Sequence, residues 1–232
     1  MRLIRKATEP ASLLSLRTDP LTNLATGPSA RSAYDQNDKP ALRQALHKEQ
    51  GYLCAFCMRR IDERPTEEPT TRIAHLVPIH HAPTLALTWS NLVGSCKGDA
   101  HPTGSTCDVA QGNSRLSVDP TQPLSIAKLR YESRAGNDAA AFITSDDSEA
   151  RADVDRKPSP QGNKDEPGTL NLNGGDLPKL RYAAWKAFQR LVQKHVRGDY
   201  GKPAGNAYLP KWLATHGEKL PPMLGYIEWK LR

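Results

Sequence analysis

The sequence predicts an α+β fold in which a cysteine-stapled core is surrounded by helices and long loops. Two cysteine pairs, Cys54 with Cys57 and Cys96 with Cys107, enclose a segment of short apolar runs. A long amphipathic helix is predicted over 176–197. The 16 glycines and 19 prolines indicate extended loops between such elements.

The 232 residues divide into four predicted parts. They are an N-terminal arm and helix (1–50), a zinc-stapled core (51–131), an acidic, Pro- and Gly-rich connector (132–168), and a strand, basic helix and aromatic tail (169–232). The connector has no apolar period, so we expect a mobile or exposed segment. Residues 1–30 look irregular, apart from a short docking strand at Leu3 and Ile4.

Two helices have clear sequence signals. In 39–50, Pro40 suits the first turn, Leu42 and Leu46 share a face, and Gly51 is a stop signal. In 176–197, Asp176 is a candidate cap. The apolar stripe there consists of Leu180, Ala184, Ala187, Phe188, Leu191 and Val192, and the basic face of Lys179, Lys186, Arg190, Lys194 and Arg197.

Shorter elements are predicted from local patterns. RIAHLVPI at 72–79 and TLNLN at 169–173 favour strands, and a helix is expected over 108–115 with Asp108 as its N-cap. The aromatic tail contains Trp212, Tyr226 and Trp229.

The net charge of +7 is compatible with a polyanionic partner or simply with solubility. No run approaches the roughly 18–20 apolar residues of a membrane helix, and the N-terminus lacks a signal-peptide run. These features predict a cytoplasmic protein without membrane contact. In that compartment, paired cysteines are more often metal ligands than disulfides.

Four thiolates from Cys54, Cys57, Cys96 and Cys107 would form a closed, tetrahedral, structural Zn²⁺ site. The long spacer of the second pair leaves two alternatives open. His101 lies within that spacer and would serve as another fourth ligand, or the four cysteines are simply reduced and buried.

Between the cysteine pairs lie His75 and Asn91, and Asp108 follows the last cysteine directly. This constellation resembles the HNH nuclease motif, in which a ββα-metal core holds one divalent cation. The resemblance implies that His75 is a general base, that Asn91 orients it, and that Asp108 binds Mg²⁺ or another divalent cation. The alternatives are a core histidine, a loop asparagine and a plain helix cap.

The sequence departs from the motif in two ways. Ala74 stands where many such sites have a second carboxylate ligand, and Gln111 stands where a lysine is common. His80 and His81 are candidate replacement ligands, although exposed loop histidines are the simpler interpretation. Asn113 is a weaker candidate for the metal role.

A narrower resemblance rests on MRLIRK, GYLCAFCMRRI, IAHLVP, WSNLVGSC, TCDVAQGN and TLNLN. Together these segments are similar to the PtuB-like HNH component of Septu-type and retron-associated anti-phage defence systems. The resemblance implies an ABC-type ATPase partner and, in retron versions, a reverse transcriptase with its RNA–DNA product. The apolar arm and aromatic tail are candidate docking segments, or they pack on their own domain.

The leading hypothesis is therefore an HNH endonuclease that hydrolyses DNA or RNA as a toxic effector of such a complex. One alternative is a zinc-stapled binding module of the same complex with a degraded active site, marked by Ala74. Another is a stand-alone DNase. The sequence does not distinguish DNA from RNA, including transfer RNA, as the substrate.

Overall fold

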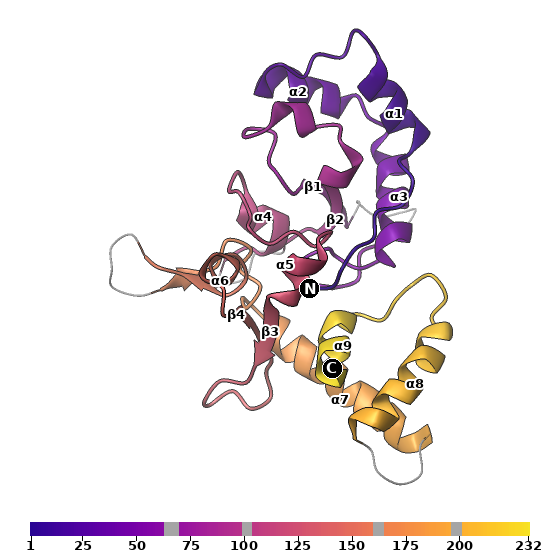
Figure 1. Cartoon of the computed structure of the whole chain (residues 1–232), viewed down its shortest axis with the longest axis vertical. Helices are drawn as coiled ribbons and strands as arrows, with labels where there is room; N and C mark the ends of the chain where they lie inside the picture. The colour runs from indigo at the N-terminus through magenta and orange to yellow at the C-terminus, as the bar shows by residue number, and fades with distance from the viewer. Residues whose placement is uncertain (63–69, 99–103, 160–164, 196–200) are drawn as a thin grey trace.

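The computed structural model describes residues 1–62, 70–98, 104–159, 165–195 and 201–232 (Figure 1). The fold is mixed α+β, as predicted. Its described helices are α1 (Ala11–Thr18), α2 (Gly27–Asp35), α3 (Lys39–Gln50), α4 (Cys107–Gln111), α5 (Pro123–Ala127), α6 (Ser148–Val154), α7 (Leu177–His195), α8 (Lys202–Ala214) and α9 (Leu224–Leu231). None of them is long and apolar enough to traverse a bilayer.

The described strands form three two-stranded antiparallel sheets. The pairs are β1 (Thr71–His75) with β2 (Leu92–Cys96), β3 (Leu129–Glu132) with β4 (Phe142–Ser145), and β5 (Arg156–Lys157) with β6 (Glu166–Pro167). Two short 3₁₀ turns, Pro83–Leu85 and Trp89–Asn91, lie between β1 and β2.

The β1–β2 hairpin is the scaffold of the centre of the molecule. Its register places Thr71 opposite Cys96 and His75 opposite Leu92. The side chain of Gln50, the last residue of α3, donates to the Gly94 carbonyl at 2.8 Å and accepts from the Gly94 N–H at 2.6 Å. This amide exchange fixes the end of α3 to the middle of β2, and α4 packs against the same strand.

Helix α3 is confirmed with its predicted bounds. The Asp38 side chain accepts from the Ala41 N–H at 3.0 Å, Leu42 and Leu46 are buried, and Gly51 ends the helix with φ +60°. A Cβ at Gly51 would lie 2.5 Å from the side chain of Leu220. Only glycine combines this left-handed backbone with such a close approach.

The prediction that residues 1–30 are irregular is wrong for α1 and for the start of α2. Thr26 and Ser29 form a capping box at the start of α2, and this pair of residues could have predicted the helix from the sequence. Leu3 and Ile4 do not form a strand. Instead Ile4 is buried, and its N–H donates to the Pro120 carbonyl at 2.8 Å.

The prediction of a mobile or exposed connector over 132–168 is wrong for its described residues, and 160–164 lie outside them. Ile143 in β4 and Val154 in α6 are buried in the central core. One oxygen of Asp153 accepts three hydrogen bonds of 2.6–2.9 Å from Ser117 and Val118. Acidic residues in this segment accept hydrogen bonds from partly buried and buried donors. The polar composition therefore did not indicate an exposed segment.

Three short elements also differ from expectation. The first strand ends at His75, because the chain turns before Pro78. The helix expected over 108–115 is α4, with Thr106 rather than Asp108 at its N-cap. TLNLN forms turns instead of a strand: Asn171 has φ +46°, and Leu170 and Leu172 both point into the core.

The C-terminal helices form the lower part of the molecule in Figure 1. Helix α7 confirms the predicted helix through residue 195. Phe188 and Val192 of α7 pack with Ile227 and Leu231 of α9, and half-buried Trp212 of α8 packs against them. Tyr226 and Trp229 pack on the central core, so the aromatic tail covers its own domain.

The two ends of the chain lie side by side (Figure 1). Arg2 and Glu228 form an ion pair at 3.0 Å. The N–H of Leu220 donates to the Gly51 carbonyl at 3.0 Å, and that of Met223 donates to Met58 at 3.1 Å. The C-terminal segment thus closes over the loop that contains the first two cysteines.

Candidate functional site

The four cysteine sulfurs form one compact cluster. Neighbouring Sγ atoms lie 3.6 Å apart for Cys96 and Cys107, 3.7 Å for Cys57 and Cys96, and 3.9 Å for Cys54 and Cys107, and all four lie within 4.8 Å of one another. A tetrahedron with Zn–S bonds of about 2.3 Å has sulfur–sulfur edges of about 3.8 Å. The donor set and its spacing therefore fit a tetrahedral metal ion such as zinc.

Local backbone geometry turns the sulfurs inward. Tyr52 and Met58 flank the first pair with φ +60° and +63°, and Cys107 itself has φ +59° at the start of α4. Non-glycine residues adopt this region at a cost, so three of them around one site indicate that the site imposes the conformation. Cys96 is supplied by the end of β2.

The thiols are electrostatically coupled. The neighbouring sulfurs of Cys54, Cys57 and Cys96, with burial, raise the pKa of Cys107 well above its ordinary value. Four buried thiolates therefore repel one another unless a cation lies between them. A divalent ion would supply that charge. Three of the four cysteines are buried, and Cys96 is partly exposed.

His75 lies on the opposite side of the hairpin from Ala74, which is buried in the core beside the cysteines. The His75 Nε2 atom lies 3.0 Å from the Ala86 carbonyl, and its ring meets Tyr34 edge-on at 4.7 Å. Because a carbonyl only accepts, Nε2 carries the proton and Nδ1 is left as the basic nitrogen. Burial lowers the pKa of His75 to about 4, so the ring is neutral at pH 7.

Asn91 is buried and braces the loop that faces His75. Its side chain accepts from the Val77 N–H at 2.7 Å and donates to the carbonyls of Val77 at 3.0 Å and Leu85 at 3.2 Å. Leu85 precedes Ala86, whose carbonyl holds the His75 ring. The side-chain hydrogen bonds of Asn91 thus go to backbone groups of the loop, and none of them reaches the His75 ring directly.

Asp108 lies in the first turn of α4 and does not cap it. Its Oδ2 accepts from Arg72 Nε at 2.6 Å, which is an ion pair between strand β1 and helix α4. The Asp108 side chain is mostly buried and that of Arg72 is half-exposed. Any cation that binds this carboxylate competes with Arg72.

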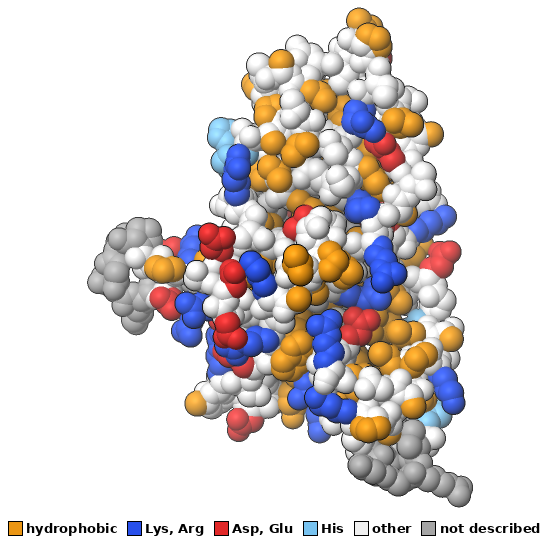
Figure 2. Space-filling model, viewed as in Figure 1, with side chains coloured by type: hydrophobic (Ala, Val, Ile, Leu, Met, Phe, Trp, Pro, Cys, Tyr) orange, Lys and Arg blue, Asp and Glu red, His pale blue; other side chains and the backbone are white. Residues whose placement is uncertain are grey.

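Helix α2, strand β1 and helix α4 enclose an open pocket. Its lining includes His75, Asp108 and Arg72 together with Arg31, His80 and Asn113. His75 and Asp108 thus face one hollow, whereas Asn91 supports it from behind. Figure 2 shows histidine beside Lys and Arg side chains on this flank of the molecule.

Sequence reasoning missed two residues that line the pocket and one that supports it from behind. Arg72 and Arg31 bring positive charge to the pocket, and neither belongs to a sequence motif that would have predicted this position. Gln111, noted only as an unusual residue, is buried and donates to the carbonyls of His75 and Leu76 at 3.2 and 3.3 Å. Gln111 therefore connects the end of β1 to α4. A polar residue within the predicted helix was the only sequence signal for this contact.

The remaining candidates take different positions. His80 is exposed and lines the pocket, and His81 contacts the Asn113 carbonyl at 2.7 Å. His101 lies outside the described residues, and all four cysteines already complete the cluster without it. No protein-family model matches the chain, and no curated protein matches it either.

Proposed function

We propose that this protein is a metal-dependent HNH endonuclease that hydrolyses phosphodiester bonds in nucleic acid. One observation carries the proposal. A neutral histidine and a carboxylate, from β1 and α4, face the same open pocket, and the hairpin and helix that hold them are joined by the cysteine cluster. That arrangement agrees with the ββα resemblance stated for the sequence.

His75 would be the general base. With Nε2–H donated to Ala86, its Nδ1 accepts a proton from water as the water oxygen attacks phosphorus. The bond from phosphorus to the leaving oxygen breaks, and that oxygen takes its proton from solvent. The low pKa of His75 keeps the base neutral throughout the physiological range.

Asp108 would hold the catalytic divalent cation, Mg²⁺ or a similar ion, which supplies charge neutralisation at the phosphate. The donors fit such an ion only in part, because Asp108 is the one carboxylate among the described residues that line the pocket. Mg²⁺ keeps several waters and is often bound through one or two carboxylates. Asn113 and His80 are the neighbouring groups that could add contacts.

A nucleic-acid substrate is supported by how charge is distributed. Residues 177–232 contain 11 Lys and Arg against 3 Asp and Glu, a net charge of +8, whereas 1–176 contain 21 against 22. The exposed cations of α7 recur at helical spacing along one face and form no ion pair among the described residues; they are Lys179, Lys186, Arg190 and Lys194. Figure 2 shows acidic and basic side chains interleaved over β3, β4 and α6 instead.

The biological setting is proposed from the PtuB-like resemblance alone. The nuclease would be the effector of an anti-phage complex with an ABC-type ATPase and, in a retron setting, a reverse transcriptase with its RNA–DNA product. Because the N-terminal arm and the aromatic tail pack on their own domain, partner contacts fall to other surfaces. Exposed Leu21 and Leu124, with exposed fractions of 90% and 82%, are the first positions to examine.

The second candidate is a catalytically degraded, zinc-stapled binding module of the same complex. It is favoured by the buried methyl group of Ala74, which leaves no room for a carboxylate ligand there, and by the engagement of Asp108 with Arg72. Under this hypothesis the pocket binds phosphate through Arg31 and Arg72 without cleaving it.

His75→Ala separates the two candidates. Loss of a general base lowers the rate by about 10²–10⁴-fold, so toxicity on expression with the partner genes and the new nucleic-acid ends should both vanish. The ends are mapped by sequencing total DNA and RNA. His216→Ala, a histidine change after α8, is the matched control and should cut like wild type. Identical ends with His75→Ala would leave the binding module as the remaining candidate.

A further inference from the structure

Arg181 is the largest fully buried side chain of the described structure, with an exposed fraction of 1%. Its guanidinium donates to the carbonyls of Leu172 at 2.6 Å and Ala141 at 3.2 Å, and to the Asn173 side chain at 3.3 Å. Carbonyls satisfy its N–H groups without neutralising its charge. A buried, uncompensated cation is costly and calls for an anion nearby.

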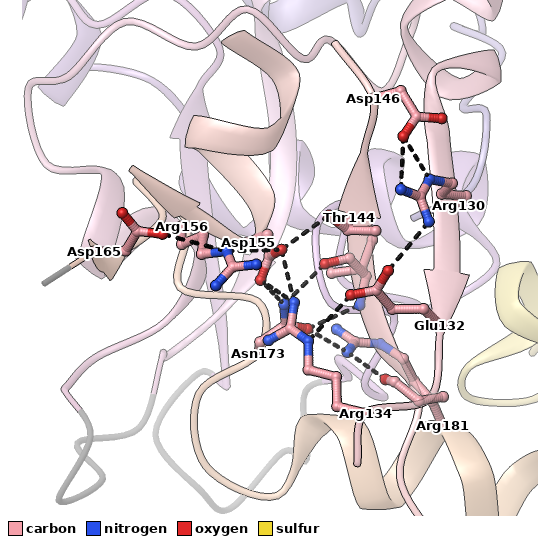
Figure 3. A network of polar contacts seen from close by, with 12 residues as sticks. Arg130, Glu132, Arg134, Thr144, Asp146, Asp155, Arg156, Asp165, Asn173 and Arg181 are labelled. Atoms are coloured by element: carbon pink, nitrogen blue, oxygen red, sulfur yellow. Dashed lines mark hydrogen bonds and ion pairs between the residues drawn. The ribbon is translucent and has the colours of Figure 1, made fainter. Parts of the chain in front are cut away.

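No carboxylate in the described part of the chain supplies that anion. The adjacent Asp155 is already occupied: Arg134 donates to both its oxygens at 2.6 and 2.7 Å, and Asn173 donates to it at 2.7 Å. Figure 3 shows Asn173 between Arg181 on one side and the Arg134–Asp155 pair on the other. Asn173 thus links two different cations: Arg134 is half-buried and has a carboxylate partner, whereas Arg181 is fully buried and has none among the described residues.

Arg181 is also connected to the cysteine cluster. The turn at 170–172 connects them: the Leu170 carbonyl accepts from the Cys107 N–H at 2.9 Å, and the Leu172 carbonyl accepts from Arg181. Leu170 and Leu172 share one buried cluster with all four cysteines. Burial lowers the pKa of Arg181, and interactions with Tyr131 and the sulfurs of Cys57 and Cys107 oppose that shift.

Four thiolates around one Zn²⁺ carry a net charge of −2. The geometry points to Arg181 as the buried counter-charge of this metal cluster, so that metal binding and docking of α7 stabilise each other. The amino group of Met1 is a second buried nitrogen near these sulfurs, bound to the Tyr131 hydroxyl at 2.5 Å. Burial lowers its pKa to about 4, which leaves Arg181 as the stronger source of positive charge.

The inference is independent of catalysis and is tested by metal affinity. Zn²⁺ binding to the whole protein is measured by competition with a chromophoric chelator at fixed pH. Arg181→Met should weaken binding about 10–100-fold, the range found when groups outside the ligand shell are removed. Arg181→Lys keeps the charge and should remain within a few-fold of wild type.

Arg134→Met is the control, because it removes a neighbouring, half-buried positive charge that already has a carboxylate partner. It should lower stability and leave zinc affinity unchanged. Equal affinity for Arg181→Met and wild type would overturn the inference. So would equal losses for Arg181→Met and Arg181→Lys, because the fork of hydrogen bonds rather than the charge would then matter.

A measurement on the unmodified protein covers the case in which Arg181→Met does not fold. Hydrogen exchange is followed with zinc bound and after chelation. The amides of α7 should lose protection with those of the cysteine loops, whereas α2, in a separate buried cluster with Leu42 and Leu87, should change less. Full protection of α7 in the metal-free protein would contradict the coupling.

Discussion

The cysteine cluster and the His75 pocket occupy opposite sides of the same hairpin and helix, yet they differ in completeness. On β1, Ala74 faces the cluster side and His75 the pocket; on α4, Cys107 and Asp108 divide in the same way. The cluster has four ligands from this chain at tetrahedral spacing. Among the described residues the pocket is lined by one carboxylate, that of Asp108, which is paired with Arg72.

Under the proposed function, this difference would separate a stabilising site from a reactive one. Structural metal sites are closed, whereas a reactive site keeps positions open for substrate, water and a labile cation. In this chain the cysteine cluster joins β2 to α4, and the proposed reactive pocket lies on the other face of the same hairpin and helix. Substitutions in the cysteine cluster should therefore change stability most, whereas substitutions in the pocket should have smaller effects on stability and act on cleavage.

The largest effect is expected from breaking the cluster. Cys57→Ser, or chelation of the wild type, removes a metal whose apparent binding free energy is about 10–16 kcal/mol in zinc-finger peptides, more than most domains have in reserve. The central core should lose its cooperative thermal transition, measured by near-ultraviolet circular dichroism. A melting temperature that is unchanged by chelation would show that the four cysteines hold no structural metal.

An intermediate effect is expected from protonating the pocket. The folded pKa of His75, about 4, lies below the unfolded value of about 6.5, so the unfolded chain binds more protons between these values. Stability should therefore fall as pH drops from 6.5 toward 4, by about 3 kcal/mol in total from this group. Urea unfolding across this range gives the slope.

His75→Gln is the comparison for that slope, since it removes the titrating ring and keeps a polar side chain. The variant should lose less stability than wild type over the same interval. Parallel curves for the two proteins would mean that His75 is not buried in neutral form and would weaken its assignment as a base that is free at neutral pH.

The smallest effect is expected from releasing Asp108. Arg72→Ala removes an ion pair that is half-exposed and worth at most about 1 kcal/mol, so the Mg²⁺ concentration for half-maximal cleavage should fall about two- to fivefold. Asp108→Asn should raise that concentration or abolish cleavage. If Arg72→Ala instead abolishes cleavage at every Mg²⁺ concentration, Arg72 contacts the substrate and does not merely compete with the cation.

Local signals predicted the parts of the fold that depend on local physics. Helix α3 has a proline, an apolar face and a glycine stop within 39–51, and α7 has a long amphipathic period. The cysteine cluster followed from residue type and spacing, and the sulfurs do converge. The prediction for residues 132–168 was wrong because it relied on composition. The pairing of β3 with β4 and the buried acceptor Asp153 depend on contacts between residues far apart in the sequence.

The pocket was predicted only as a set of residues. His75 and Asp108 meet there, but the partner of each is remote in sequence: Ala86 is 11 positions away and Arg72 is 36 positions from Asp108. The Ala86 partner is a backbone carbonyl, which no side-chain motif can encode. Asn91 shows the same limit, since its role depends on which backbone groups the loop presents to it.

The closing contacts between the C-terminal segment and the first cysteine loop bear on biosynthesis. Residues 220–225 cover Gly51 and Met58, although all four sulfur ligands leave the ribosome more than a hundred residues earlier. Chains emerge at about 5–20 residues per second, so a nascent chain has several seconds with its ligands exposed. If the four cysteines hold a metal, that interval leaves time for the ion to bind before residues 220–225 cover the loop.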